Sequence, residues 1–272
     1  MKDYETLPRN PYFEVLGSLN RENRSDCKVG MLTEVDLTQC ARLRERLGKE
    51  TGTKPSYTAF VAAAIVRALQ AMPEANRIVV TRWPFGRRIV QLNRIDISVL
   101  VERDRPGSEQ ATYAATIEHV DSLDLVSITR TLQGFAQSTE ETSPRWKTFR
   151  TIVEKVPAFI ARRLLTVPNL SPELWIKHRG GAVAISSPAK YGVDMMVATW
   201  PWPIGFSFGF VKPRPWVVDG KLEVRTTMVV TMSFDRRLLA GAPGARFFNL
   251  VCQNLETAET TLSGALVRAS DS

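Results

Sequence analysis

The stretch LEVRTTMVVTMSFDRRLLAGAPGARFFNLVCQNLE, residues 222–256, decides the fold of this chain. Its pattern predicts a long strand over residues 222–234, a loop over residues 233–241 and a helix over residues 241–264. The strand is apolar enough to be buried, and rigid strand ends are where folds commonly display chemistry. We therefore expect the loop to carry the function. It contains no histidine, and it holds Asp235, Arg236, Arg237, Ala240 and Gly241.

The bulk composition is that of an ordinary globular chain. Of the 272 residues, 44% are hydrophobic and 24% are charged, which allows a sizeable core in one large or two small domains. No apolar run approaches the roughly 20 residues that span a membrane, and residues 1–10 contain no signal-peptide core. Cys27, Cys40 and Cys252 lack metal-ligand spacing. We expect free thiols, no metal site, no membrane contact and a cytoplasmic location.

The positive charge of the chain points to anionic partners without identifying one. A net charge of +8 favours polyanions, but there is no nucleic-acid motif and no dense run of lysine and arginine, so we do not expect nucleic acid. A phosphate-bearing cofactor or an anionic protein would be attracted equally well. A solvated basic surface without a specific role explains the charge as well.

The rest of the chain is predicted to be an N-terminal arm, residues 1–28, and a single domain, residues 29–272. Strands and helices alternate, with several hairpins, which predicts an α/β sandwich with a mixed sheet. Further strands are expected at residues 31–37, 77–82, 88–92, 95–101, 111–118, 180–187 and 204–212. Further helices are expected from Thr38 onward and at residues 56–72, 123–135, 146–156 and 158–165.

Two groups of side chains outside the loop are candidates for a site. Ser186 lies at the end of the buried strand that residues 180–187 predict. Trp200, Trp202 and Phe206 could line an apolar substrate pocket, although packing inside the protein explains these aromatic residues as well.

Four segments resemble the catalytic domain of 2-oxo acid dehydrogenase dihydrolipoyl acyltransferases, a fold shared with chloramphenicol acetyltransferase. The resemblance spans about residues 31–262 and is weakest over residues 139–178. It implies a two-layer sandwich with a mixed sheet and packed helices. The segments are Glu34-Val35-Asp36-Leu37-Thr38, the helix at residues 56–73 with Glu74-Ala75-Asn76, the strand at residues 180–187, and the hairpin and loop at residues 217–221 and 233–247.

The resemblance also implies a homotrimer, or a larger multiple of trimers, with active sites between subunits and coenzyme A as the acyl cosubstrate. In the family a loop histidine is the general base, a neighbouring subunit's hydroxyl stabilises the oxyanion, and a loop aspartate holds the loop. Ser186 falls on the hydroxyl, Arg236 on the histidine and Ala240 on the aspartate. Arginine stays protonated and cannot accept a proton. Asp235 and Arg237 are expected to form a structural ion pair.

No other residue is an obvious replacement for the base. His119 is expected to have a surface or packing role. His178 is about 25 Å from Ser186 if the chain between them is extended. Cys252 is expected to be buried, and Cys40 lacks a visible partner.

Two interpretations therefore stay open. The chain is either a degenerate acyltransferase with a structural or partner-binding role, or a coenzyme A-dependent acyltransferase whose Ser186 and Arg236 work by non-standard chemistry, Arg236 clamping an anion. The family's lipoyl-bearing and subunit-binding domains are not expected in this chain, so they would have to be supplied by other chains.

Overall fold

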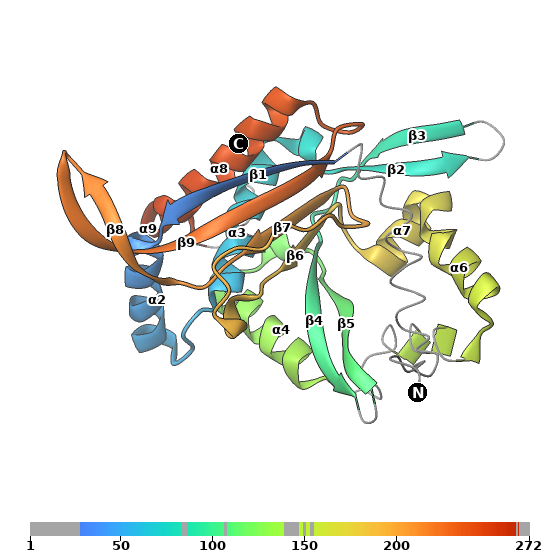
Figure 1. Ribbon diagram of the computed structural model, residues 1–272, viewed down its shortest axis with the longest axis horizontal. Helices are drawn as coiled ribbons and strands as arrows, with labels where there is room; N and C mark the ends of the chain where they lie inside the picture. The colour runs from blue at the N-terminus through green and yellow to red at the C-terminus, as the bar shows by residue number, and fades with distance from the viewer. Residues whose placement is uncertain are drawn as a thin grey trace, which may run out of the picture.

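A seven-stranded sheet organises the protein, which was analysed as a computed structural model that describes residues 28–82, 86–105, 108–138, 147–148, 151–152, 155–264 and 266. The strand order is β1-β9-β7-β6-β4-β5, and β8 pairs with the first half of β9 (Figure 1). The strands are β1 (Lys28–Asp36), β4 (Ile97–Arg105), β5 (Ser108–Ile117), β6 (Val183–Ser186), β7 (Ile204–Phe208), β8 (Lys212–Val218) and β9 (Lys221–Asp235). The pairs β4–β6 and β6–β7 are parallel and the others antiparallel, so the sheet is mixed as predicted.

The helices form the second layer, and helix α3 lies at its centre. The helices are α2 (Thr38–Thr51), α3 (Tyr57–Ala71), α4 (Leu125–Gln137), α6 (Ala158–Thr166), α7 (Pro172–Arg179), α8 (Gly241–Glu256) and α9 (Ala258–Thr261). Helix α3 packs against α4 and α8. It begins where the Ser56 side chain accepts a hydrogen bond from the Ala59 amide, and Pro73 follows its end, as predicted.

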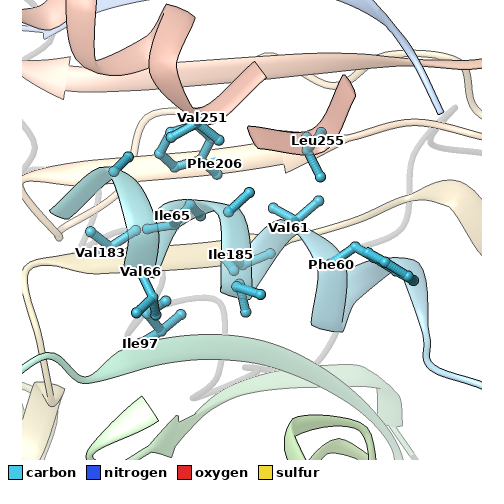
Figure 2. Close-up of a cluster of buried hydrophobic side chains, with 14 of the residues drawn as sticks. Phe60, Val61, Ile65, Val66, Ile97, Val183, Ile185, Phe206, Val251 and Leu255 are labelled. Atoms are coloured by element: carbon cyan, nitrogen blue, oxygen red, sulfur yellow. The ribbon is translucent and has the colours of Figure 1, made fainter. Parts of the chain in front are cut away.

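The hydrophobic core fills the space between the sheet and these helices. Figure 2 shows side chains of α3, including Phe60 and Ile65, in one cluster with Val183 of β6, Phe206 of β7 and Val251 of α8. The side chains of Phe60, Ile65 and Phe206 are completely buried. Because α3 is apolar nearly all round, it can contact the sheet on one side and other helices on the others. The predicted two-layer α/β architecture is therefore confirmed.

The predicted helix over residues 241–264 is interrupted once and ends early, because α8 ends at Glu256 and the short α9 covers only Ala258–Thr261. Thr257 separates the two helices, with φ −106° and ψ 30°. Its hydroxyl donates a hydrogen bond to the Gln253 carbonyl at 2.7 Å, and such local bonds compete with regular helix geometry.

A separate hairpin stands beside the main sheet. Strands β2 (Arg77–Arg82) and β3 (Gly86–Gln91) pair in antiparallel register, with Thr81 opposite Arg87 and Val79 opposite Ile89. The hairpin projects next to α7 (Figure 1), and β2 contacts the short helix η4 (Val167–Leu170). The predicted arm at residues 1–28 lies outside the described residues, except for Lys28. Of the predicted helix at residues 146–156, residues 146, 149–150 and 153–154 also lie outside them.

Candidate functional site

Strand β9 ends in a tightly fixed loop. Met232 and Phe234 point into the core, whereas Asp235 belongs to the opposite face. The Asp235 carbonyl accepts hydrogen bonds from the Leu238 and Leu239 amides at 3.0 and 3.2 Å, which close a tight turn.

Gly244 secures the far side of the loop, in the first turn of α8. A Cβ atom at Gly244 would lie 2.6 Å from Cζ of Phe234, so only glycine allows the helix to approach the strand this closely. The loop is therefore held at both of its ends, by the turn at Asp235 and by this helix–strand contact.

The predicted ion pair between Asp235 and Arg237 is present. The guanidinium Nε of Arg237 donates to the two carboxylate oxygens at 2.9 and 3.1 Å, and its amide donates to Oδ1 at 2.9 Å. Asp235 is 4% exposed. Burial raises the pKa of this carboxyl, but the hydrogen bonds and charge of Arg237, with the charge of Lys28, outweigh burial and hold the pKa below its ordinary value. Asp235 is therefore a charged structural group and a poor proton acceptor.

Arg236 and Ala240, which the resemblance matches to the loop histidine and the loop aspartate, are exposed. Ala240 is the N-cap of α8 and provides no side-chain hydrogen bond, and the exposed Gly241 is the first residue of that helix. The loop therefore displays a guanidinium at residue 236 and a methyl group at residue 240.

A cavity of about 390 Å³ opens beside this loop. Its walls come from the β2–β3 hairpin, from the segment α6–η4–α7, from the turn before β7 and from the loop itself. The lining residues are Val79, Thr81, Arg87, Thr166, Asn169, Leu170, Trp175, Arg179, Pro201, Pro203, Asp235, Arg237 and Leu238. Arg236 is not among them, so the guanidinium that faces the cavity from the loop belongs to Arg237.

Arg179 contributes a second guanidinium from the end of α7, where it is 7% exposed. It lies over the ring of Trp175, 5.1 Å from the centroid, and donates a hydrogen bond to the Leu165 carbonyl at 3.1 Å. The next two residues fix its position. Gly180 adopts φ 71°, which favours glycine, and a Cβ at Gly181 would lie 1.8 Å from the Asp96 carbonyl oxygen.

Ser186 lies far from the loop within one chain. Phe234 pairs with Ile204, and Ile204 pairs with Val183, so the loop is at the start of β6 and Ser186 is at its end. The register places Ser186 about 10 Å from the end of β9 along the strands and about 10 Å across them. Ser186 and Arg236 therefore do not meet in a single subunit.

The three aromatic candidates pack inside the protein and do not line the cavity. Phe206 is completely buried, with its ring centroid 6.2 Å from that of Phe247. Trp202 is 8% exposed and donates a hydrogen bond to the Arg179 carbonyl at 2.8 Å. The indole of Trp200 covers Gly205, where a Cβ would lie 1.6 Å from Cδ1. These contacts favour the packing role that the sequence left open.

The remaining titratable candidates, His119, His178, Cys40 and Cys252, are not among the described residues that line the cavity. His119, with φ 48°, and His178, on α7, are both exposed. Burial raises the pKa of the Cys40 thiol, and the charge of Asp36 adds to this effect. Burial, with the charge of Glu256, raises the pKa of the Cys252 thiol to about 12.

Sequence reasoning missed Arg87 and Arg179 as partners of the loop, because they come from segments far away in the chain. The one available signal was strand alternation, which puts Val79, Thr81 and Arg87 on the same face of the hairpin. In the described part of the chain, no helix is both long and apolar enough to cross a membrane.

The chain matches the family model described as 2-oxoacid dehydrogenases acyltransferase (catalytic domain), over residues 14–150 and 176–263. It is 24% identical over 235 residues to the succinyltransferase component of the 2-oxoglutarate dehydrogenase complex of Rickettsia conorii, with 84% of this chain and 50% of that protein covered. The chain thus spans about half the length of the curated relatives it matches.

Solved structures of low sequence identity share the fold. The dihydrolipoamide acetyltransferase of Azotobacter vinelandii has a TM-score of 0.69 and 18% identity, covering 96% of this chain and 94% of that chain. The cubic core of a pyruvate dehydrogenase multienzyme complex has a TM-score of 0.68 and 19% identity, with the same coverage of 96% and 94%.

Proposed function

The chain belongs to the family of 2-oxoacid dehydrogenase acyltransferase catalytic domains, and we propose that within it this chain is a non-catalytic member with a structural or partner-binding role. The observation that carries the proposal is the exposed Arg236 in the loop after β9, where the family has its general base. A histidine and an asparagine four positions apart were studied in the catalytic mechanism of the Azotobacter vinelandii enzyme. Arg236 and Ala240 have the same spacing here.

Arg236 cannot perform the proton transfer of a general base. A guanidinium stays protonated at physiological pH, and loss of a positioned base typically costs about 10²–10⁴ in rate. The neighbouring carboxylate of Asp235 is engaged by Arg237, and its lowered pKa makes it a weak base. No described group of the loop therefore supplies the missing function.

We propose a homotrimer, or a larger multiple of trimers, as the assembly. The distance between Ser186 and Arg236 within one chain supports it, because a site using both needs a second subunit. The β8–β9 arm also supports it (Figure 1): Val217 lies opposite Leu222, and both are exposed, at 68% and 75%, next to Val224 at 77%. Exposed apolar strips of this kind commonly mark protein–protein contacts. We also propose a cytoplasmic location, since Cys40 and Cys252 are free thiols.

Restoring the family residues tests the proposal. The wild-type protein is expected to show no acetyl transfer from acetyl-CoA to dihydrolipoamide, whereas Arg236→His combined with Ala240→Asp is expected to gain it. Arg236→Gln with Ala240→Asp is the matched control, because it removes the same charge without adding a base. Wild-type turnover that disappears in Arg236→Ala would overturn the non-catalytic role.

The exposed guanidinium of Arg236 supports a second candidate, a coenzyme A-dependent acyltransferase with non-standard chemistry in the pocket between subunits. In this candidate Ser186 stabilises the oxyanion and Arg236 binds an anionic group of the substrate. Coenzyme A should then bind at equilibrium, and turnover should fall in Ser186→Ala. A protein that neither binds coenzyme A nor is stabilised by it against heat argues against this candidate.

A further inference from the structure

We propose that the cavity beside the loop is a binding site for a small anionic molecule, whose phosphate or carboxylate group is held among Arg87, Arg179 and Arg237. All the described residues that line the cavity come from one chain, and neither Ser186 nor Arg236 is among them. The proposal concerns Arg237, which faces the cavity, and not the exposed Arg236 beside it.

The charges of the lining residues favour an anion. Among the described residues that line the cavity, three are arginines and one is a carboxylate, Asp235. Asp235 is bound by both Nε and the amide of Arg237, and arginines outnumber carboxylates three to one among the described lining residues. Arginines remain charged at any physiological pH. An oxyanion in a cavity lined by arginines gains charge-assisted hydrogen bonds from their guanidinium groups.

Two of the three guanidinium groups are fixed before any ligand binds. Arg179 is buried, stacks over Trp175 and is held by the Leu165 carbonyl. Arg237 is held by Asp235. Side chains that are already ordered lose little conformational freedom on binding, which favours affinity. Arg87 comes from the exposed strand β3 and completes the set from the opposite wall.

The rest of the lining defines the body of the ligand. The uncharged polar lining residues are Thr81, Thr166 and Asn169, and the apolar lining residues include Val79, Leu170, Trp175 and Leu238. A volume of about 390 Å³ lies within the roughly 300–1,000 Å³ typical of small-molecule sites. The ligand class is therefore a small molecule with an apolar body and one anionic end, either a phosphate ester or a carboxylic acid.

Binding of three compounds with the same ring tests the site: phenyl phosphate, phenylacetate and the uncharged benzyl alcohol. Isothermal titration calorimetry on the full chain should give saturable binding of at least one anion and none of benzyl alcohol. The stronger of the two anions identifies the phosphate or the carboxylate source. Binding should also weaken as salt is raised, because the attraction is electrostatic.

The matched variants are Arg87→Gln and Arg88→Gln, which remove the same charge from adjacent exposed residues. Arg88 pairs with Val80 on the other face of the hairpin and does not line the cavity. Arg87→Gln should weaken anion binding about 10-fold or more, as expected for a charge-assisted hydrogen bond of about 1.5–3 kcal/mol. Arg88→Gln should change binding less than about twofold.

Filling the cavity provides a second, independent variant. Leu170 lines the cavity and is 53% exposed, so Leu170→Trp should fold and should block anion binding. The proposal is overturned if neither anion binds more tightly than benzyl alcohol, if the two arginine variants weaken binding equally, or if Leu170→Trp leaves binding unchanged. Because these are binding measurements on the wild-type loop, none of these results bears on acetyl transfer.

Discussion

Replacing Arg237 by alanine should destabilise the protein through the carboxylate it leaves behind. The variant removes the guanidinium contacts to Asp235 but keeps the 2.9 Å hydrogen bond from the residue 237 amide. Breaking a fully buried ion pair costs about 3–5 kcal/mol. The Arg237 side chain is 36% exposed, so solvent screens the pair. We therefore expect a loss of about 1–3 kcal/mol in the free energy of unfolding, the range for removing one partner of a buried hydrogen-bonding group.

The pH dependence of this loss gives its cause. The folded-state pKa of Asp235 lies below its ordinary value, so the ion pair contributes its full stability above pH about 4, near the ordinary carboxyl pKa. That stability disappears as the pH falls through the lower folded-state pKa. Arg237→Ala should therefore be less stable than the wild type at pH 7, and the difference should shrink progressively below pH 4.

Urea denaturation followed by tryptophan fluorescence, at a fixed protein concentration, measures the effect. A double-mutant cycle with Asp235→Asn isolates the pair, and Arg236→Ala serves as the exposed neighbour, expected within about 0.5 kcal/mol of the wild type. A coupling energy below about 0.5 kcal/mol, or a loss that is equal at pH 7 and at pH 3, would refute the ion pair as the source of stability.

Two further predictions concern packing and thiol reactivity. Gly205→Ala should lower the free energy of unfolding by about 1–3 kcal/mol and shift the fluorescence spectrum, because its Cβ would meet the Trp200 ring. The control is Gly134→Ala, in open space on α4, which should be neutral or stabilising by up to about 1 kcal/mol. Equal melting curves for the two variants would contradict this prediction. Cys252 should resist alkylation by iodoacetamide at pH 8 in the native protein and react after denaturation, because burial raises the thiol pKa to about 12. Rapid labelling of the Cys252 peptide in the native protein, detected by mass spectrometry, would refute this prediction.

Most of the fold follows from local patterns in the sequence. The apolar run of α3 and the long strand β9 are predicted because their periodicity is strong and their ends carry clear signals, such as Ser56 and Pro73. Strand β8 is not predicted, because Pro213 and Pro215 argue against a strand interior. In the structure β8 pairs only with β9 among the described strands, and both prolines are exposed, so β8 is an edge strand, where proline is tolerated.

The candidate site is harder to predict, because it depends on one turn and on distant segments. Strand alternation stops at Asp235, where two amides bond the same carbonyl. That turn decides that Arg237, and not Arg236, faces the cavity. Arg87 and Arg179 reach the same cavity only through the packing of the hairpin and α7 against the loop, a long-range contact that no local pattern encodes.

The acyltransferase candidate and the anion site differ in the number of subunits that each requires, and this difference allows an experiment to separate them. Chemistry that uses Ser186 and Arg236 together needs two subunits, because the register of β6, β7 and β9 keeps these residues apart in one chain. The anion site needs one subunit, because Arg87, Arg179 and Arg237 line the same cavity. Dilution that dissociates the assembly should therefore abolish any acyl transfer while leaving anion affinity per chain unchanged. A loss of both together would place the arginine cavity in the subunit interface.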